Sequence, residues 1–211
     1  METQKSGKRA LRTEANRELI IKTALQLFNE KGYDKTTMAD IIHASGLTNG
    51  TIYHLFGNKQ SIISGIYDYY FDVELGLNEN QEEKIQNPLP HIRQFLLDYE
   101  QLWMDAGWAL PANTYRIYEN LYFKKNTEEL LLDNLSSTSK EELKQFIRAA
   151  QEYGTIRKDL DAKFIVTTIF VFGRGLLYQW SLAKGKYDLV TSSIPYWDTF
   201  LPTFLAEKET V

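Results

Sequence analysis

Apolar residues recur at helical spacing near the start of the chain. Within residues 14–31 they fall at every third or fourth position, a period typical of an amphipathic helix with one buried face. Lys31 and Gly32 follow, and a cation followed by glycine is typical of a helix C-terminus. The pattern predicts a first helix over 14–31, with ordered structure beginning at about residue 14.

Three more helices are predicted before residue 80, separated by very short turns. Thr37 and Asp40 form the pattern of a capping box, which opens a short helix that ends near Ser45. Thr48 is placed to cap the next helix, which runs to about Leu55. Asn58 is placed to cap a fourth helix from residue 59 to about residue 77.

The rest of the chain is also helical in pattern. A polar stretch at 78–90 ends in Pro-Leu-Pro and marks a domain boundary. Asp159 or Asp161 can cap a strongly apolar helix that continues to about Ala183. No segment shows the alternation of apolar and polar residues that is typical of a β-strand, so we expect an all-α fold. The other predicted helices span 91–108, 113–123, 127–153 and, interrupted by two prolines, 192–206.

Composition narrows the possible classes of protein. The chain has 211 residues and no cysteine, which excludes disulfides and thiolate metal sites. The apolar segment 164–182 carries Arg174 near its middle and is therefore read as a buried helix, not a membrane span. The N-terminus lacks the apolar stretch of a signal peptide. We expect a cytoplasmic protein without membrane association.

The net charge of −4 hides two unlike halves. Residues 1–60 carry nine Lys and Arg against six Asp and Glu, whereas residues 61–211 have a net charge of −7. A small basic unit joined to a larger acidic one is typical of a nucleic-acid-binding domain on another kind of body, although so modest an excess could also arise by chance.

The helices at 37–45 and 48–55, joined through Gly46, have the layout of a helix-turn-helix. In that motif the N-terminal residues of the second helix enter the major groove of DNA. Hydroxyls can bind phosphates, Asn and His can reach base edges, and a glycine permits close approach of the backbone. A helical hairpin with solvated polar residues is the simpler interpretation of the same periodicity. The residues that would face DNA are Thr48, Asn49, Gly50, Thr51, Tyr53 and His54.

The segment from Leu19 to Tyr69 resembles the DNA-binding domain of the TetR family of bacterial transcriptional regulators. The resemblance rests on residues 24–33 (ALQLFNEKGY), 36–42 (TTMADII), 44–56 (ASGLTNGTIYHLF) and the pair Asn58-Lys59. A weaker similarity covers 154–161 (GTIRKDLD) and the apolar helix that follows, where the family approaches its dimerising helices.

This resemblance implies a homodimer that reads a palindromic operator and is released by a small-molecule effector. It implies a helix-turn-helix domain over 1–58, a connecting helix over 59–78, and a helical ligand-binding and dimerisation domain over 79–211. The dimer would form through 164–182 and 192–206. The DNA-binding residues that it carries over are Thr37, Thr48, Asn49, Gly50, Thr51, Tyr53, His54 and Lys59.

The acidic body is rich in Tyr and Trp, which suit a pocket for a hydrophobic or aromatic effector but equally suit a core. Arg174 is either a pocket cation for an anionic ligand or one partner of a structural ion pair with a carboxylate such as Glu100 or Glu119. The effector-binding candidates are Trp103, Tyr115, Tyr118, Tyr122, Arg174 and Tyr178.

Other classes of function fit less well. The histidines (His43, His54 and His91) match no metal or catalytic-triad spacing, and no nucleotide-binding fingerprint is present. We therefore expect no enzymatic activity, no metal and no cofactor. The alternatives that stay open are a helical regulator or interaction protein without a small-molecule ligand, and an activator in place of a repressor.

Overall fold

The computed structural model describes residues 2–71, 73–112 and 138–207. This part of the chain is helical and contains no β-strand, apart from an isolated bridge between Ile156 and Leu205, so the all-α prediction is confirmed. Within it, no helix is long and apolar enough to cross a membrane. The helices are α1 (Glu2–Lys31), α2 (Met38–Ser45), α3 (Asn49–Phe56), α4 (Lys59–Phe71), α5 (Gln81–Lys84), α6 (Pro88–Ala106), α8 (Thr138–Tyr153), α9 (Ala162–Leu182), α10 (Leu189–Phe200) and the 3₁₀ helix η1 (Leu201–Phe204).

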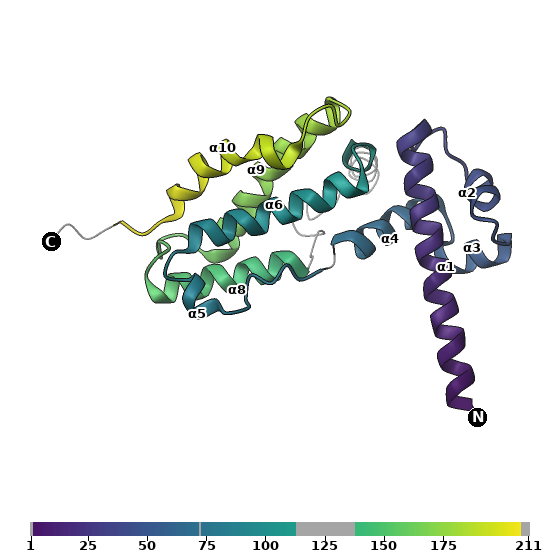
Figure 1. Cartoon of the computed structure of the whole chain (residues 1–211), viewed down its shortest axis with the longest axis horizontal. Coiled ribbons are helices and arrows are strands. Elements are labelled where there is room, and N and C mark those ends of the chain that lie inside the picture. Colours follow the sequence, from purple (N-terminus) through teal and green to yellow (C-terminus); the bar gives the residue numbers. More distant parts are fainter. Residues whose placement is uncertain (1, 72, 113–137, 208–211) are drawn as a thin grey trace, which may run out of the picture.

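Figure 1 shows two parts, a head made of α1–α3 and a body made of α5–α10, with α4 between them. The head core is built from the apolar faces of its short helices, with Phe28, Ile41 and Ile52 fully buried. Trp103 and Trp180 of the body belong to the same cluster. The head core is therefore continuous with the adjoining end of the body.

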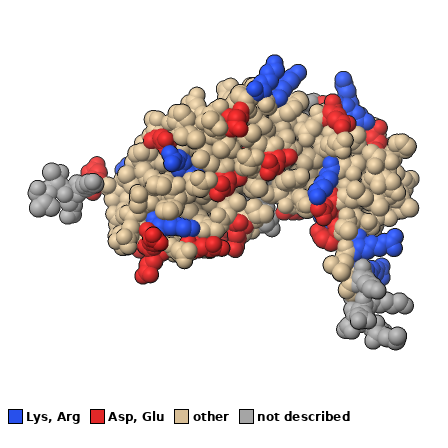
Figure 2. Space-filling view, in the orientation of Figure 1, with Lys and Arg blue, Asp and Glu red and all other residues tan. Residues whose placement is uncertain are grey.

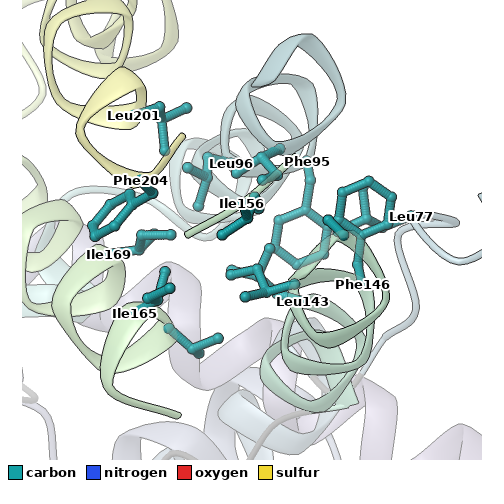
Figure 3. Packing of buried hydrophobic residues seen from close by; sticks show 14 of the residues in the cluster. Leu77, Phe95, Leu96, Leu143, Phe146, Ile156, Ile165, Ile169, Leu201 and Phe204 are labelled. Atoms are coloured by element: carbon teal, nitrogen blue, oxygen red, sulfur yellow. The ribbon is translucent and has the colours of Figure 1, made fainter. Parts of the chain in front are cut away.

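A second cluster fills the far end of the body (Figure 3). Leu143 and Phe146 of α8 meet Phe95 of α6 there, and α9 and η1 close the cluster with Ile165 and Phe204. These buried side chains come from segments up to about a hundred residues apart, so the cluster fixes how α6, α8 and α9 lie against one another.

Two helix limits at the head differ from those expected. Helix α1 begins at Glu2, not at residue 14, because the added residues have no apolar stripe for a periodicity argument to detect. Helix α4 ends at Phe71, not near residue 77. Gly76 there has a left-handed φ of 73°, and the N–H groups of Leu75 and Leu77 donate to the carboxylate of Glu142, which holds this segment outside a helix.

Helix limits in the body also differ from those expected. Helix α6 starts at Pro88, within the expected boundary, because proline is tolerated in the first turn of a helix. Helix α10 begins at Leu189, where Asp188 accepts a hydrogen bond from the N–H of Thr191 at 2.7 Å. Asp161, one of two proposed caps, does cap α9. The helix predicted at 113–123 and the first part of that predicted at 127–153 lie outside the described residues.

Candidate nucleic-acid interface

Both helices of the predicted helix-turn-helix begin at side-chain caps. The N–H of Thr37 donates to Asp40 Oδ2 at 2.7 Å, and the N–H of Asp40 donates to Thr37 Oγ1 at 3.1 Å. The carboxylate of Asp40 thus accepts from the N–H of Thr37 and, at 2.7 Å, from the Thr37 hydroxyl; these two bonds, with the ammonium of Lys31 at 3.0 Å, lower the pKa of Asp40 to about 2. Gly46 ends α2 with a left-handed φ of 67°, which turns the chain into the next helix. The capping box predicted from the sequence is confirmed.

Helix α3 opens at Thr48, whose Oγ1 accepts a hydrogen bond from the N–H of Thr51 at 3.2 Å. The two hydroxyl oxygens lie 2.9 Å apart. Such a cap satisfies a backbone donor that the first turn of a helix would leave unpaired. The predicted cap is therefore confirmed, and the same two hydroxyls stand at the surface end of the helix.

The sides of α3 differ sharply in chemistry. Ile52 and Phe56 are buried in the head core. In contrast, Asn49, Tyr53 and His54 are exposed, and an added Cβ at Gly50 would meet no atom closer than 4.0 Å. One side of α3 holds the helix in the head, and the other presents hydrogen-bonding groups and open backbone to the solvent.

A groove of about 370 Å³ runs between α3 and α1. Thr13 and Asn16 line its α1 side, whereas Thr48, Gly50, Thr51, His54 and Leu55 line the other. No pattern in the sequence indicated that Thr13 and Asn16 belong to this surface, because their position beside α3 depends on how α1 crosses the head.

The ammonium of Lys59 points into the head. It donates to the carbonyl oxygens of Tyr33 at 2.7 Å and Thr36 at 2.8 Å, and it lies 4.1 Å from the centroid of the Tyr33 ring. Desolvation by burial lowers its pKa. Lys59 therefore fixes the loop before α2, and an ammonium has one further donor for an outside acceptor.

The predicted effector residues lie in different surroundings. Trp103 is 5% exposed in the core shared by head and body. Tyr178 is 45% exposed on α9, and Arg174 on the same helix is half-buried. Neither the groove beside α3 nor a small cavity between α6 and α10 is lined by these three residues. Tyr115, Tyr118 and Tyr122 lie outside the described residues.

The carboxylate of Glu100, considered above as a partner of Arg174, bonds to α10. It accepts hydrogen bonds from the hydroxyl of Ser193 and, at 2.9 Å, from Nε1 of Trp197. Burial raises its pKa to about 7, against the opposing effect of these two donors. Glu100 thereby ties α6 to one of the two predicted dimerisation helices. Glu119 lies outside the described residues.

Comparison with known proteins finds a family model that matches the head and relatives that match most of the chain. Residues 20–66 match the family model described as bacterial regulatory proteins, tetR family. The chain is 28% identical over 193 residues to the HTH-type transcriptional regulator TtgR of Pseudomonas putida, covering 88% of this chain and 89% of TtgR. It is 23% identical over 201 residues to the probable acrEF/envCD operon repressor of Escherichia coli, covering 91% of this chain and 88% of that protein.

Solved structures agree in fold. The fatty acid degradation regulator FadR from Bacillus halodurans superposes with a TM-score of 0.62 at 21% identity, over 87% of this chain and 97% of FadR. The family model covers α2, α3 and parts of α1 and α4. It therefore includes most of the head core and the exposed side of α3.

Proposed function

We propose that this chain, which belongs to the tetR family of bacterial regulatory proteins, is a ligand-responsive DNA-binding transcriptional repressor. The observation that carries the proposal is the two-sided character of α3. Its apolar side is buried, while Asn49, Tyr53 and His54 are exposed beside a glycine with open space around it. That is the arrangement which a recognition helix needs in the major groove.

Each exposed group of α3 has a role in this docking. The Thr48 and Thr51 hydroxyls and the Tyr53 phenol bind phosphates, which fixes the register of the head on the duplex. Asn49 and His54 reach base edges and supply sequence discrimination. Gly50 lets the backbone of α3 come close to DNA. Thr37 and Lys59 position α2 and its preceding loop, and the remaining donor of Lys59 binds a phosphate.

A second copy of the chain pairs through α9 and α10. Along α9, exposed apolar side chains recur at helical spacing, at Phe164, Val171, Tyr178 and Leu182, and Tyr196 is 55% exposed on α10. Apolar stripes of this kind mark interaction surfaces. A dimer also suits the target, because half-sites about 34 Å apart require two linked heads.

The effector acts through the contacts between body and head. The side chain of Asn29 on α1 donates to the carbonyl of Ala106 at 3.2 Å and accepts from the N–H of Ala109 at 3.3 Å, and Trp103 lies in the same shared core. A small hydrophobic or aromatic effector bound beside Trp103 would favour another position of α6 and α4. The usual coupling is about 1–3 kcal/mol, a 5- to 150-fold change in operator affinity.

The partners are therefore operator DNA, a second copy and a small molecule, all met in the cytoplasm. A regulatory role accounts for the described surface without any catalytic step. An activator would use the same contacts at a differently placed operator, so the position of the recovered site relative to a promoter distinguishes it from a repressor.

The test is selection of random duplex DNA by the purified chain at a stated salt concentration. A palindrome with half-sites about one helical turn apart is the expected result. Recovery of no enriched sequence, with only salt-sensitive binding, would contradict operator recognition and favour a helical interaction protein. The control is Tyr53→Ala with Asn49→Ala, which should abolish enrichment while leaving the fold intact, because both side chains are exposed.

A further inference from the structure

The N-terminal end of α1 extends beyond the head (Figure 1). Every described side chain from Arg9 to Ala15 is exposed, and the first buried residue of the helix is Ile20. At 1.5 Å per residue, the part of α1 before Thr13 is about 16 Å long. Figure 1 shows it projecting past α3 into the solvent. The head core therefore does not explain this extension.

The helical register places two arginines of the extension on the groove side of α1. Thr13 and Asn16 line the groove with α3. Arg9 lies four residues before Thr13 and seven before Asn16, and Arg12 lies four before Asn16, spacings that share one helix face. Both arginines are exposed. The groove-lining face of α1 thus continues outward as a basic face.

The first two acidic residues that follow the arginines along α1, Glu14 and Glu18, lie off this basic face or are already paired. Glu14 is two residues from Arg12 and from Asn16, which places it on another side. Glu18 is bonded to Lys22 at 2.6 Å and to the hydroxyl of Tyr69 at 2.8 Å. Figure 2 shows blue side chains on the projecting part of α1, whereas red ones gather along the lower edge of the body. The charge of the extension is complementary to a polyanion.

We propose that Arg9 and Arg12 bind phosphates of the DNA that flanks each half-site, so that α1 extends the footprint of the head. This inference rests on the proposed function, because α3 must first place the head on DNA. The arginines share a surface with α3, and guanidinium groups are well suited to phosphate oxygens.

The direction of the extension also determines which part of the DNA it would reach. In Figure 1 the N-terminus of α1 points to the side of the molecule opposite α10, the helix that we expect in the dimer interface. In a dimer paired through α9 and α10, the two extensions therefore lie at the outer ends. They would contact DNA outside the palindrome, not the spacer between its halves.

The experiment measures affinity for two duplexes built on the operator recovered by selection. The short duplex ends at the outer edge of each half-site, and the long one adds about five base pairs at each end, the distance that a helix of about 16 Å spans at about 3.4 Å per base pair. The full-length chain should bind the long duplex at least about tenfold more tightly. Arg9→Gln/Arg12→Gln should lose this preference, and its slope of log K against log salt should fall by about 3–4, for four phosphates per dimer.

Two further variants separate charge from other effects. Arg9→Lys/Arg12→Lys keeps both charges and should retain most of the preference for the long duplex. Arg148→Gln/Lys158→Gln removes the same charge from exposed positions on α8 and the loop after it, and it should bind both duplexes like the unmodified chain.

The outcomes are distinct. Equal binding of both duplexes by the unmodified chain, or an unchanged preference in Arg9→Gln/Arg12→Gln, overturns the role of the extension and leaves the proposed function standing, since the short duplex is still bound. Failure of the unmodified chain to bind either duplex contradicts the proposed function, and the role of the extension with it.

Discussion

The backbone N–H of Leu75 donates a hydrogen bond to Oε2 of Glu142 at 2.7 Å, which joins two segments 67 residues apart. The N–H of Leu77 donates to the other oxygen of the same carboxylate, and Ser139 donates to the carbonyl of Val73 at 2.6 Å. One buried carboxylate on α8 thus holds the turn that follows α4, at the junction between head and body.

Removal of this carboxylate should destabilise the fold. Glu142→Ala leaves the N–H groups of Leu75 and Leu77 without their acceptor, which should lower the free energy of unfolding by about 2–4 kcal/mol. Urea denaturation measures the loss. Glu141→Ala on the same helix is the control, because that side chain is half exposed and pairs with Lys144 on the surface, so its change should stay below about 1 kcal/mol. Equal stability of the two variants would contradict the role of Glu142.

Gly65 of α4 and Gly50 of α3 should respond in opposite ways to substitution by alanine. An added Cβ at Gly65 would overlap the buried ring of Phe56, whereas at Gly50 it meets open space. Gly65→Ala should therefore destabilise the packing of α4 on α3 by about 1–3 kcal/mol through overpacking.

Gly50→Ala should keep its thermal stability, because alanine favours the helix, and should lose operator affinity, because the added methyl group holds α3 away from DNA. Thermal unfolding and a DNA titration on both variants check the pair. Unchanged operator affinity in Gly50→Ala would show that the backbone of α3 does not approach DNA closely.

Stability should fall as the pH rises through the titration of Glu100. Burial raises the pKa of this carboxyl to about 7 in the folded chain, whereas an unfolded glutamate titrates near its ordinary value of about 4.3. Between these values the folded state binds more protons than the unfolded state, so the contribution is fully present below about pH 4 and is lost as the pH passes through about 7.

Glu100→Gln should remove this dependence, since a neutral amide can still accept from Trp197 and bond to Ser193. It should raise the free energy of unfolding at pH 8 by about 1–3 kcal/mol and change it little at pH 5. Urea denaturation of both proteins at the two pH values checks the sign. A parallel pH dependence in Glu100→Gln would assign the effect to another group.

A charge on the apolar stripe of α9 should dissociate the dimer. Val171 is 48% exposed in one chain, and Val171→Glu would place an unpaired carboxylate against the second copy, at a cost of several kcal/mol. Sedimentation equilibrium should report a monomer, and operator affinity should fall because one head alone makes few contacts. Tyr153→Glu, at a comparably exposed position at the end of α8, should remain dimeric. A dimeric Val171→Glu would exclude this face from the interface.

Local chemistry determined much of the head from the sequence alone. The caps at Thr37, Thr48 and Asp161 follow from residues two or three positions apart, and the buried positions of α2 and α3 follow from helical period. Interactions of such short range do not depend on how the elements pack. The same local pattern indicated which side of α3 faces outward.

Only the tertiary structure decided what distant segments do to one another. The early end of α4 depends on Glu142, the inward position of Lys59 on carbonyls 23 and 26 residues away, and the link between α6 and α10 on Glu100. The groove shared by α1 and α3, and with it the direction of Arg9 and Arg12, also appears only when the helices cross. A sequence encodes the spacing of residues along each helix, whereas the partner that a buried polar group finds is settled by packing across the whole chain.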